Sequence, residues 1–220
     1  MRTGTHLTRE FRLFLFQLRD VKKLLLIPGV FLILLIPLLL FLTMKKYEDL
    51  SYAEEYLELL AQYLMPVLSV WGPGFAFVNL IESEGEEVHY VNHRMKDSQM
   101  LLWLGLYLVF LALWFGIVGI WLEGVWMEYL RQVISCCFYT GLLYCVMYWG
   151  GSMTLAFLAV GLYWMASLFA HQIPLDILNC YDPRTMTAEL LEEKYIYLML
   201  AAAVLYVFGL IGNRQKQQFH

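Results

Sequence analysis

An unbroken apolar run extends from Leu24 to Met44, with no charged side chain inside it and a pair of lysines at each end. The hydrocarbon core of a bilayer is about 30 Å thick, and a helix needs about 20 mostly apolar residues to cross it. The run therefore predicts a membrane-spanning helix. It is long for the apolar region of a signal peptide, and no small-x-small cleavage site precedes Lys45. We therefore expect it to remain as the first span.

The rest of the chain is similarly apolar. Of its 220 residues, 60% are hydrophobic and 15% are charged, whereas a soluble domain has about 25% charged residues. The composition predicts an all-α integral membrane protein, a single domain over residues 1–220 with no sizeable soluble part. The predicted spans are residues 24–44, 57–80, 100–122, 133–149, 152–170 and 195–212.

Two of these spans come from one long apolar region, residues 133–170. As a single helix the region would measure about 57 Å, nearly twice the hydrocarbon thickness. We therefore expect a break at Gly150-Gly151-Ser152. Cys137, Gly141 and Cys145 in the first half are four residues apart and form a small-residue face that lets a neighbouring helix approach closely.

Glu123, Glu128 and Arg131 separate the third span from the fourth. Three charges near the bilayer centre would cost roughly 9 kcal/mol, at about 3 kcal/mol each. We therefore expect the chain to turn there and to keep all three side chains outside the membrane. Residues 171–194 form the longest outer connection, and its apolar part, Ile173 to Leu178, is expected to dip back into the membrane edge as a re-entrant element.

The N-terminal segment, residues 1–23, is amphipathic. Between His6 and Lys23, apolar residues recur on one helical face and most basic residues lie on the other. This pattern is typical of an interfacial helix, which would form an elbow along the cytoplasmic surface. A basic flank that only orients the first span fits equally well.

The lysines and arginines indicate the orientation. With the N-terminus inside, ten lie on cytoplasmic segments: six before Leu24, then Arg94, Lys96, Arg214 and Lys216. Five lie outside: Lys45, Lys46, Arg131, Arg184 and Lys194. Because cytoplasmic loops are rich in Lys and Arg, we expect a multi-pass protein of the plasma membrane with both termini in the cytoplasm.

The second span contains helix-breaking residues, Pro66 and Gly72-Pro73-Gly74. Such breaks are tolerated at membrane depth only against protein or a water-filled cavity. One interpretation is a broken helix that lines a translocation path. The other, which is the more common situation, is a packed kink with no transport role.

Residues 82–99 form the polar block between the second and third spans. After Gly85, the residues Val88, Val91 and Met95 recur at intervals of three and four, which places them on one face of a short helix. An apolar face on a surface helix needs a partner. We therefore expect this cytoplasmic segment to bind another protein.

The sequence predicts no catalytic, cofactor-binding or metal-binding residues. His89 and His93 could share a helix face with Glu86, but there is no HExxH motif and no convincing further zinc ligand. No GxxxxGK[ST] loop is present for nucleotide hydrolysis. The net charge of -4 and the lack of a basic tract argue against nucleic acid as a partner.

Six spans, a basic amphipathic lead-in and an acidic segment after the second span together resemble the permease subunits of type 2 ATP-binding-cassette (ABC) exporters. The local motif is Glu82-Ser83-Glu84-Gly85-Glu86-Glu87-Val88, which is similar to the family's acidic-glycine segment before its coupling helix. It lacks the Thr that often follows that glycine in the family and the Ser/Thr-Pro pair beyond it, so the chain resembles a divergent member.

The resemblance implies a permease that couples ATP hydrolysis on a separate ATPase subunit to export. The chain itself would hold no cofactor, with ATP and Mg on the partner, and it would pair with a second permease chain, identical or different. The contact with the ATPase would involve Glu82, Glu84, Gly85, Glu86, Glu87, Val88, Val91 and Met95. Two alternatives come from other classes: an intramembrane enzyme, protease-like or metal-dependent, and a six-span scaffold or immunity protein that transports nothing.

Overall fold

In the computed structural model, residues 3–47, 50–81, 94–120, 124–169 and 176–218 are described, and all regular structure within them is helical. The helices are α1 (Thr3–Val21), α2 (Leu26–Val30), η1 (Phe31–Leu35), α3 (Ile36–Tyr47), α4 (Leu50–Leu68), α5 (Trp71–Ile81), α7 (Arg94–Val118), α8 (Val125–Gly150), α9 (Met153–Phe169), η3 (Asp176–Leu178), α10 (Ala188–Leu190), η4 (Leu191–Tyr195) and α11 (Ile196–Gln218).

Four helical stretches in the described residues are long and apolar enough to cross a membrane: Leu26–Thr43, Asp97–Val118, Val125–Gly150 and Ala188–Gln215. The helix Met153–Phe169 is apolar but shorter. The chain is therefore a multi-pass membrane protein, as its composition predicts.

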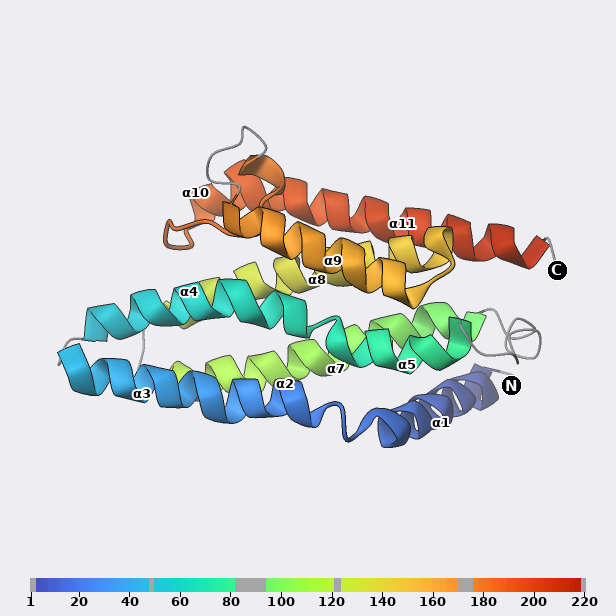
Figure 1. The fold of residues 1–220 in the computed structure, drawn as a ribbon, viewed down its shortest axis with the longest axis horizontal. Helices are drawn as coiled ribbons and strands as arrows, with labels where there is room; N and C mark the ends of the chain where they lie inside the picture. The colour runs from blue at the N-terminus through green and yellow to red at the C-terminus, as the bar shows by residue number, and fades with distance from the viewer. Residues whose placement is uncertain (1–2, 48–49, 82–93, 121–123, 170–175, 219–220) are drawn as a thin grey trace.

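The helices run side by side along the long axis of the molecule, and both ends of the chain lie at the same end of the bundle (Figure 1). The helix α5 ends and the helix α7 begins at that same end. The opposite end holds the start of α4 and the small helix α10. We call these the terminal end and the far end of the bundle.

The N-terminal segment forms the predicted helix, α1, which packs on α5 and α7. Phe14 is buried and meets the ring of Trp103 edge to face, with 5.2 Å between the ring centroids. The indole nitrogen of Trp103 donates a hydrogen bond to Gln17 at 3.3 Å. One face of α1 thus joins the core, and its location in the membrane interface stays a prediction.

The helix α8 packs along α11. A Cβ atom added to Gly141 would lie 3.1 Å from the carbonyl oxygen of Ala202, so the small-residue face indeed allows a close approach. The helix ends at Gly150, and Gly151 takes a φ of 65° before α9 starts at Met153. The long apolar region is therefore broken where its length and its glycines predict.

The structure places Glu128 and Arg131 inside the protein, and their location outside the membrane stays a prediction. The chain does turn at Gly124, whose φ is 73°, but both charged residues lie within helix α8 and are buried. The cost estimated for them assumed charges without partners. Their partners come from a distant part of the chain, as described below.

Candidate functional site

The second predicted span is broken between α4 and α5, at Ser69 and Val70. Pro66 sits inside the last turn of α4, where it has no N–H to donate. The N–H of Ser69 bonds back to the carbonyl of Pro66 at 3.2 Å instead of continuing the helix. The break thus follows Pro66 and precedes Gly72-Pro73-Gly74.

The carbonyl of Met65 is freed by this break, because the N–H of Ser69 that would normally reach it is used elsewhere. The hydroxyl of Tyr107, on α7, donates to that carbonyl at 2.6 Å. The hydroxyl of Ser69 donates to the carbonyl of Pro66 at 2.5 Å. The break is therefore stable in an apolar surrounding, where a free backbone polar group would be costly.

A half-enclosed groove of about 230 Å³ lies beside the break. One face of α2, the break itself and one face of α7 form its walls. We call it the α2–α7 groove. It is lined by Leu25, Pro28, Gly29, Leu32, Leu68, Ser69, Gly72, Pro73, Trp103, Leu106, Tyr107 and Phe110.

Two glycines of the predicted kink have packing roles. A Cβ atom on Gly72 would lie 2.8 Å from the indole of Trp103, and one on Gly74 would clash with the ring of Phe157. These glycines let α5 approach α7 and α9 closely. The kink is therefore packed, and Gly72 and Pro73 also line the groove. A translocation path along the broken helix stays a prediction.

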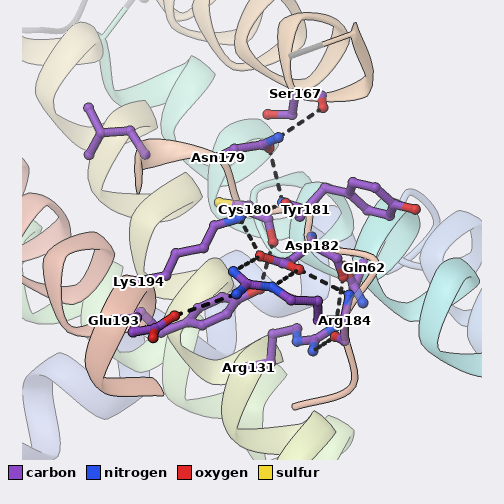
Figure 2. Close-up of polar contacts among 12 residues, drawn as sticks. Gln62, Arg131, Ser167, Asn179, Cys180, Tyr181, Asp182, Arg184, Glu193 and Lys194 are labelled. Atoms are coloured by element: carbon purple, nitrogen blue, oxygen red, sulfur yellow. Dashed lines mark hydrogen bonds and ion pairs between the residues drawn. The ribbon is translucent and has the colours of Figure 1, made fainter. Parts of the chain in front are cut away.

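A buried ionic cluster lies beside α10, which is at the far end of the bundle (Figure 1), and Figure 2 shows its polar contacts. Its members are Glu128 and Arg131 of α8, Asp182 of the connection before α10, and Lys194 of η4, all of them at most 4% exposed. Lys194 Nζ lies 2.9 Å from Asp182 Oδ2, and Arg131 Nη1 lies 3.3 Å from Glu128 Oε2. Each of the two buried cations thus has a carboxyl group within ion-pair distance.

Arg131 also binds the backbone of the connection. It donates to the carbonyl oxygens of Asp182 at 3.3 Å and Arg184 at 2.6 Å. Lys194 donates to the carbonyl of Tyr181 at 2.9 Å. Residues 179–187, which we call the strap, are therefore fixed to α8 and η4 through their main chain as well as through side chains.

The strap also binds α4. Gln62 accepts a hydrogen bond from the N–H of Asp182 at 3.0 Å, and Tyr63 stacks on Tyr181 with 4.6 Å between ring centroids. Asn179 donates to the carbonyl of Ser167 on α9 at 3.4 Å. One short segment thus joins α4, α8, α9 and η4 at the far end of the bundle.

The ionisation of two strap residues reflects these surroundings. Burial opposes the charged form of Asp182, but its hydrogen bonds and charge contacts with Arg184 and Lys194 outweigh burial and lower its pKa below the ordinary aspartate value. Burial raises the pKa of the Cys180 thiol to about 12. Asp182 is therefore an anion, and Cys180 an unreactive thiol, at neutral pH.

At the terminal end, Asp97 in the first turn of α7 connects three helices. Tyr144 of α8 donates a hydrogen bond to Asp97 Oδ1, and Asn213 of α11 donates to the same oxygen at 2.8 Å. The start of α7 is thus fixed to the α8–α11 pair. We call these three residues the Asp97 junction.

The predicted ATPase contact falls almost wholly outside the described residues. This holds for Glu82, Glu84, Gly85, Glu86, Glu87, Val88 and Val91. Met95 belongs to the first turn of α7, so the end of the predicted coupling segment is part of the long third helix. The apolar segment Ile173 to Leu178 lies partly outside the described residues too, and its end, Asp176–Leu178, is a short 3-10 helix.

Sequence reasoning missed Asp182 and Lys194 as cluster members, although Glu128 and Arg131 gave a signal. Two opposite charges three residues apart at the start of an apolar helix indicate an internal pair. In the described part of the chain, no group of three or more His, Cys, Asp and Glu side chains could hold a metal ion.

Comparisons with protein-family models, with curated proteins and with solved structures find no match to this chain.

Proposed function

We propose that the chain is the transmembrane permease subunit of an ABC transporter, an exporter driven by ATP hydrolysis on a separate subunit. Its six membrane crossings would be α2–α3, α4–α5, α7, α8, α9 and α11, with both termini in the cytoplasm of a cell whose plasma membrane holds it. ATP and Mg would bind the partner ATPase. A second permease chain, identical or different, would complete the transporter.

The Asp97 junction is the observation that carries this proposal. Residues 82–93 connect α5 to α7, and both helix ends lie at the terminal end of the bundle (Figure 1). Asp97 follows that segment within one turn of α7 and binds Tyr144 and Asn213. A force on the acidic segment would therefore pass directly to α8 and α11.

These two helices offer a continuous path to the far end. They pack along each other through Gly141 and Ala202, and near the far end they meet the buried ionic cluster that holds the strap. Movement of α8 against α11 would strain the contacts of Arg131 and Lys194 with the strap. The proposed transport cycle is thus mechanical: the ATPase subunits close, the helices rock, and the strap end opens.

Co-purification tests the proposal. The detergent-solubilised protein is isolated from its native membrane and compared with Val88→Asp/Val91→Asp, which places charges on the predicted docking face. As a matched control, Thr185→Asp/Ala188→Asp adds the same charges at exposed positions of the far end. We expect a nucleotide-binding subunit with the wild type and the control, and its loss from the first variant.

Wild-type protein that brings down no ATPase under gentle conditions would contradict the permease proposal. The intramembrane enzyme and the non-transporting scaffold would then be the hypotheses to test. The mass of the purified complex distinguishes a pair of identical permease chains from a mixed pair.

A further inference from the structure

The α2–α7 groove has the features of a lipid site. Its two walls are helical faces with the same spacing: Leu25, Pro28, Gly29 and Leu32 on one side, and Trp103, Leu106, Tyr107 and Phe110 on the other. The wall from Leu25 to Leu32 is about 10 Å long at the helical rise of 1.5 Å per residue. The groove is therefore elongated along the membrane-crossing direction.

Its interior is suited to an apolar occupant. The polar side-chain groups among its lining residues are the hydroxyls of Ser69 and Tyr107 and the indole N–H of Trp103. The hydroxyls donate to the backbone carbonyls of Pro66 and Met65, and the indole donates to Gln17. A polar solute would find these donors already in use. A hydrocarbon chain needs no hydrogen-bond partner.

The surface beside the groove is apolar and exposed. Leu26 and Ile27 flank one wall and Leu101 flanks the other, with exposed fractions of 64%, 42% and 60%. In a helix that crosses a membrane, such side chains face lipid. The groove is thus accessible from the acyl-chain region of the bilayer.

A basic turn lies next to the groove. Lys22 and Lys23 are exposed and come directly before Leu24 and Leu25. Trp71 of α5 donates a hydrogen bond to the carbonyl of Leu24 at 3.1 Å, which fixes this turn beside the groove. With the exposed Arg19 and Asp20, the turn carries a net charge of about +2, and basic clusters beside a membrane helix attract anionic head groups.

We infer that the groove binds one acyl chain of an anionic phospholipid whose phosphate head group lies at Lys22 and Lys23. Binding requires both the groove and the lysines: the groove holds the acyl chain, and the lysines attract the negatively charged head group. It does not depend on the transport proposal, because it concerns the resting protein in its bilayer.

Native mass spectrometry of the full-length chain tests the inference. Delipidated protein is titrated with phosphatidylglycerol and, separately, with phosphatidylcholine of the same acyl chains. We expect one tightly bound phosphatidylglycerol per chain and weaker binding of phosphatidylcholine. Glycerol phosphate, which has the head-group charge but no chains, should not compete.

Gly29→Leu examines the groove. A Cβ atom at Gly29 meets no other atom within 4 Å, and Gly29 lines the groove, so we expect the larger side chain to occupy space in the groove. Gly161→Leu is the matched control, since Gly161 is equally unobstructed and does not line the groove. We expect Gly29→Leu to lose binding of both lipids by tenfold or more, and Gly161→Leu to bind as the wild type.

Lys22→Gln/Lys23→Gln examines the charge. Each lysine near an anionic surface contributes about fivefold to affinity, so phosphatidylglycerol should bind far more weakly while phosphatidylcholine is unaffected. Lys45→Gln/Lys46→Gln removes the lysine pair at the other end of the first span and should change neither affinity.

Equal lipid binding by Gly29→Leu and wild type would overturn the inference, as would equal losses from the two lysine-pair variants. A delipidated wild type that dimerises and a monomeric Gly29→Leu would show that a second copy of the chain occupies the groove. Should Gly29→Leu not fold, the lysine variants still decide: the rise in Tm on adding phosphatidylglycerol must be lost with Lys22 and Lys23 and kept with Lys45 and Lys46.

Discussion

The ammonium group of Lys194 lies 2.9 Å from the carboxylate of Asp182, and both side chains are almost fully buried. The two residues are 12 positions apart, one on the strap and one on η4. Lys194 also donates to the carbonyl of Tyr181 at 2.9 Å. This pair is therefore one of the contacts that fix the strap on the bundle.

Removal of one partner should release the strap. Lys194→Met leaves the buried Asp182 carboxylate with Arg184, whose side chain is 56% exposed. Loss of one member of a buried ion pair typically costs about 3–5 kcal/mol. We expect a clearly lower Tm in detergent. We also expect maleimide to label the Cys180 thiol, which is protected by burial in the wild type. Peptide mass spectrometry measures this labelling.

Glu193→Gln is the control for that experiment. Its ion pair with Arg184 is 3.5 Å long and lies at the surface, with both side chains more than half exposed. Exposed pairs contribute about 0–1 kcal/mol, so this variant should keep the wild-type Tm and an unlabelled Cys180. Labelling of Cys180 to the same extent in both variants would contradict the assignment of Lys194 as the residue that holds the strap.

The strap should also respond to acid. The folded pKa of Asp182 is lower than its ordinary value of 3.8, so ionisation of Asp182 stabilises the folded state above that value and the stabilisation is lost as the pH falls below it. Between pH 5 and pH 8 this group should make no pH-dependent contribution. The test is the Tm of wild type and Asp182→Asn between pH 3 and pH 8, where the difference should shrink only below about pH 4.

The sequence was sufficient to predict structural features that depend on residues close to one another along the chain. The break at Gly150-Gly151-Ser152 follows from helix length and from glycine, and the packing of Gly141 follows from small residues four apart. The buried positions of Glu128 and Arg131 were not predictable in the same way. The backbone that Arg131 binds at Asp182 is 51 residues away, and the apolar pattern of a helix does not encode such a contact.

Gly209→Ala should destabilise the α8–α11 packing. A Cβ atom at this position would clash with the ring of Tyr144, which is buried and also bound to Asp97, so the ring has little room to move. Overpacking of this kind costs about 1–3 kcal/mol. Gly161→Ala, where the added methyl group meets open space, should instead gain up to about 1 kcal/mol of helix propensity. Thermal unfolding of the two variants should therefore shift in opposite directions.

Asp97→Ala should loosen the start of α7. The change leaves the hydroxyl of Tyr144 and the amide of Asn213 without their shared acceptor, at a cost of about 1–3 kcal/mol for buried groups. We expect faster hydrogen exchange over residues 94–100 and a lower Tm. Asp97→Asn keeps a side-chain oxygen at the same place, so its Tm and its rate of hydrogen exchange should be close to those of the wild type.

Under the permease proposal, Asp97→Ala separates binding of the ATPase from transmission of its movement to α8 and α11. Because residues 82–93 are unchanged, Asp97→Ala should recover the partner ATPase as the wild type does, while the start of α7 exchanges faster. If hydrogen exchange in Asp97→Ala matched that of the wild type, Asp97 would not be the residue that fixes α7 to α8 and α11. Movement of the acidic segment would then have to reach the strap through α5 instead.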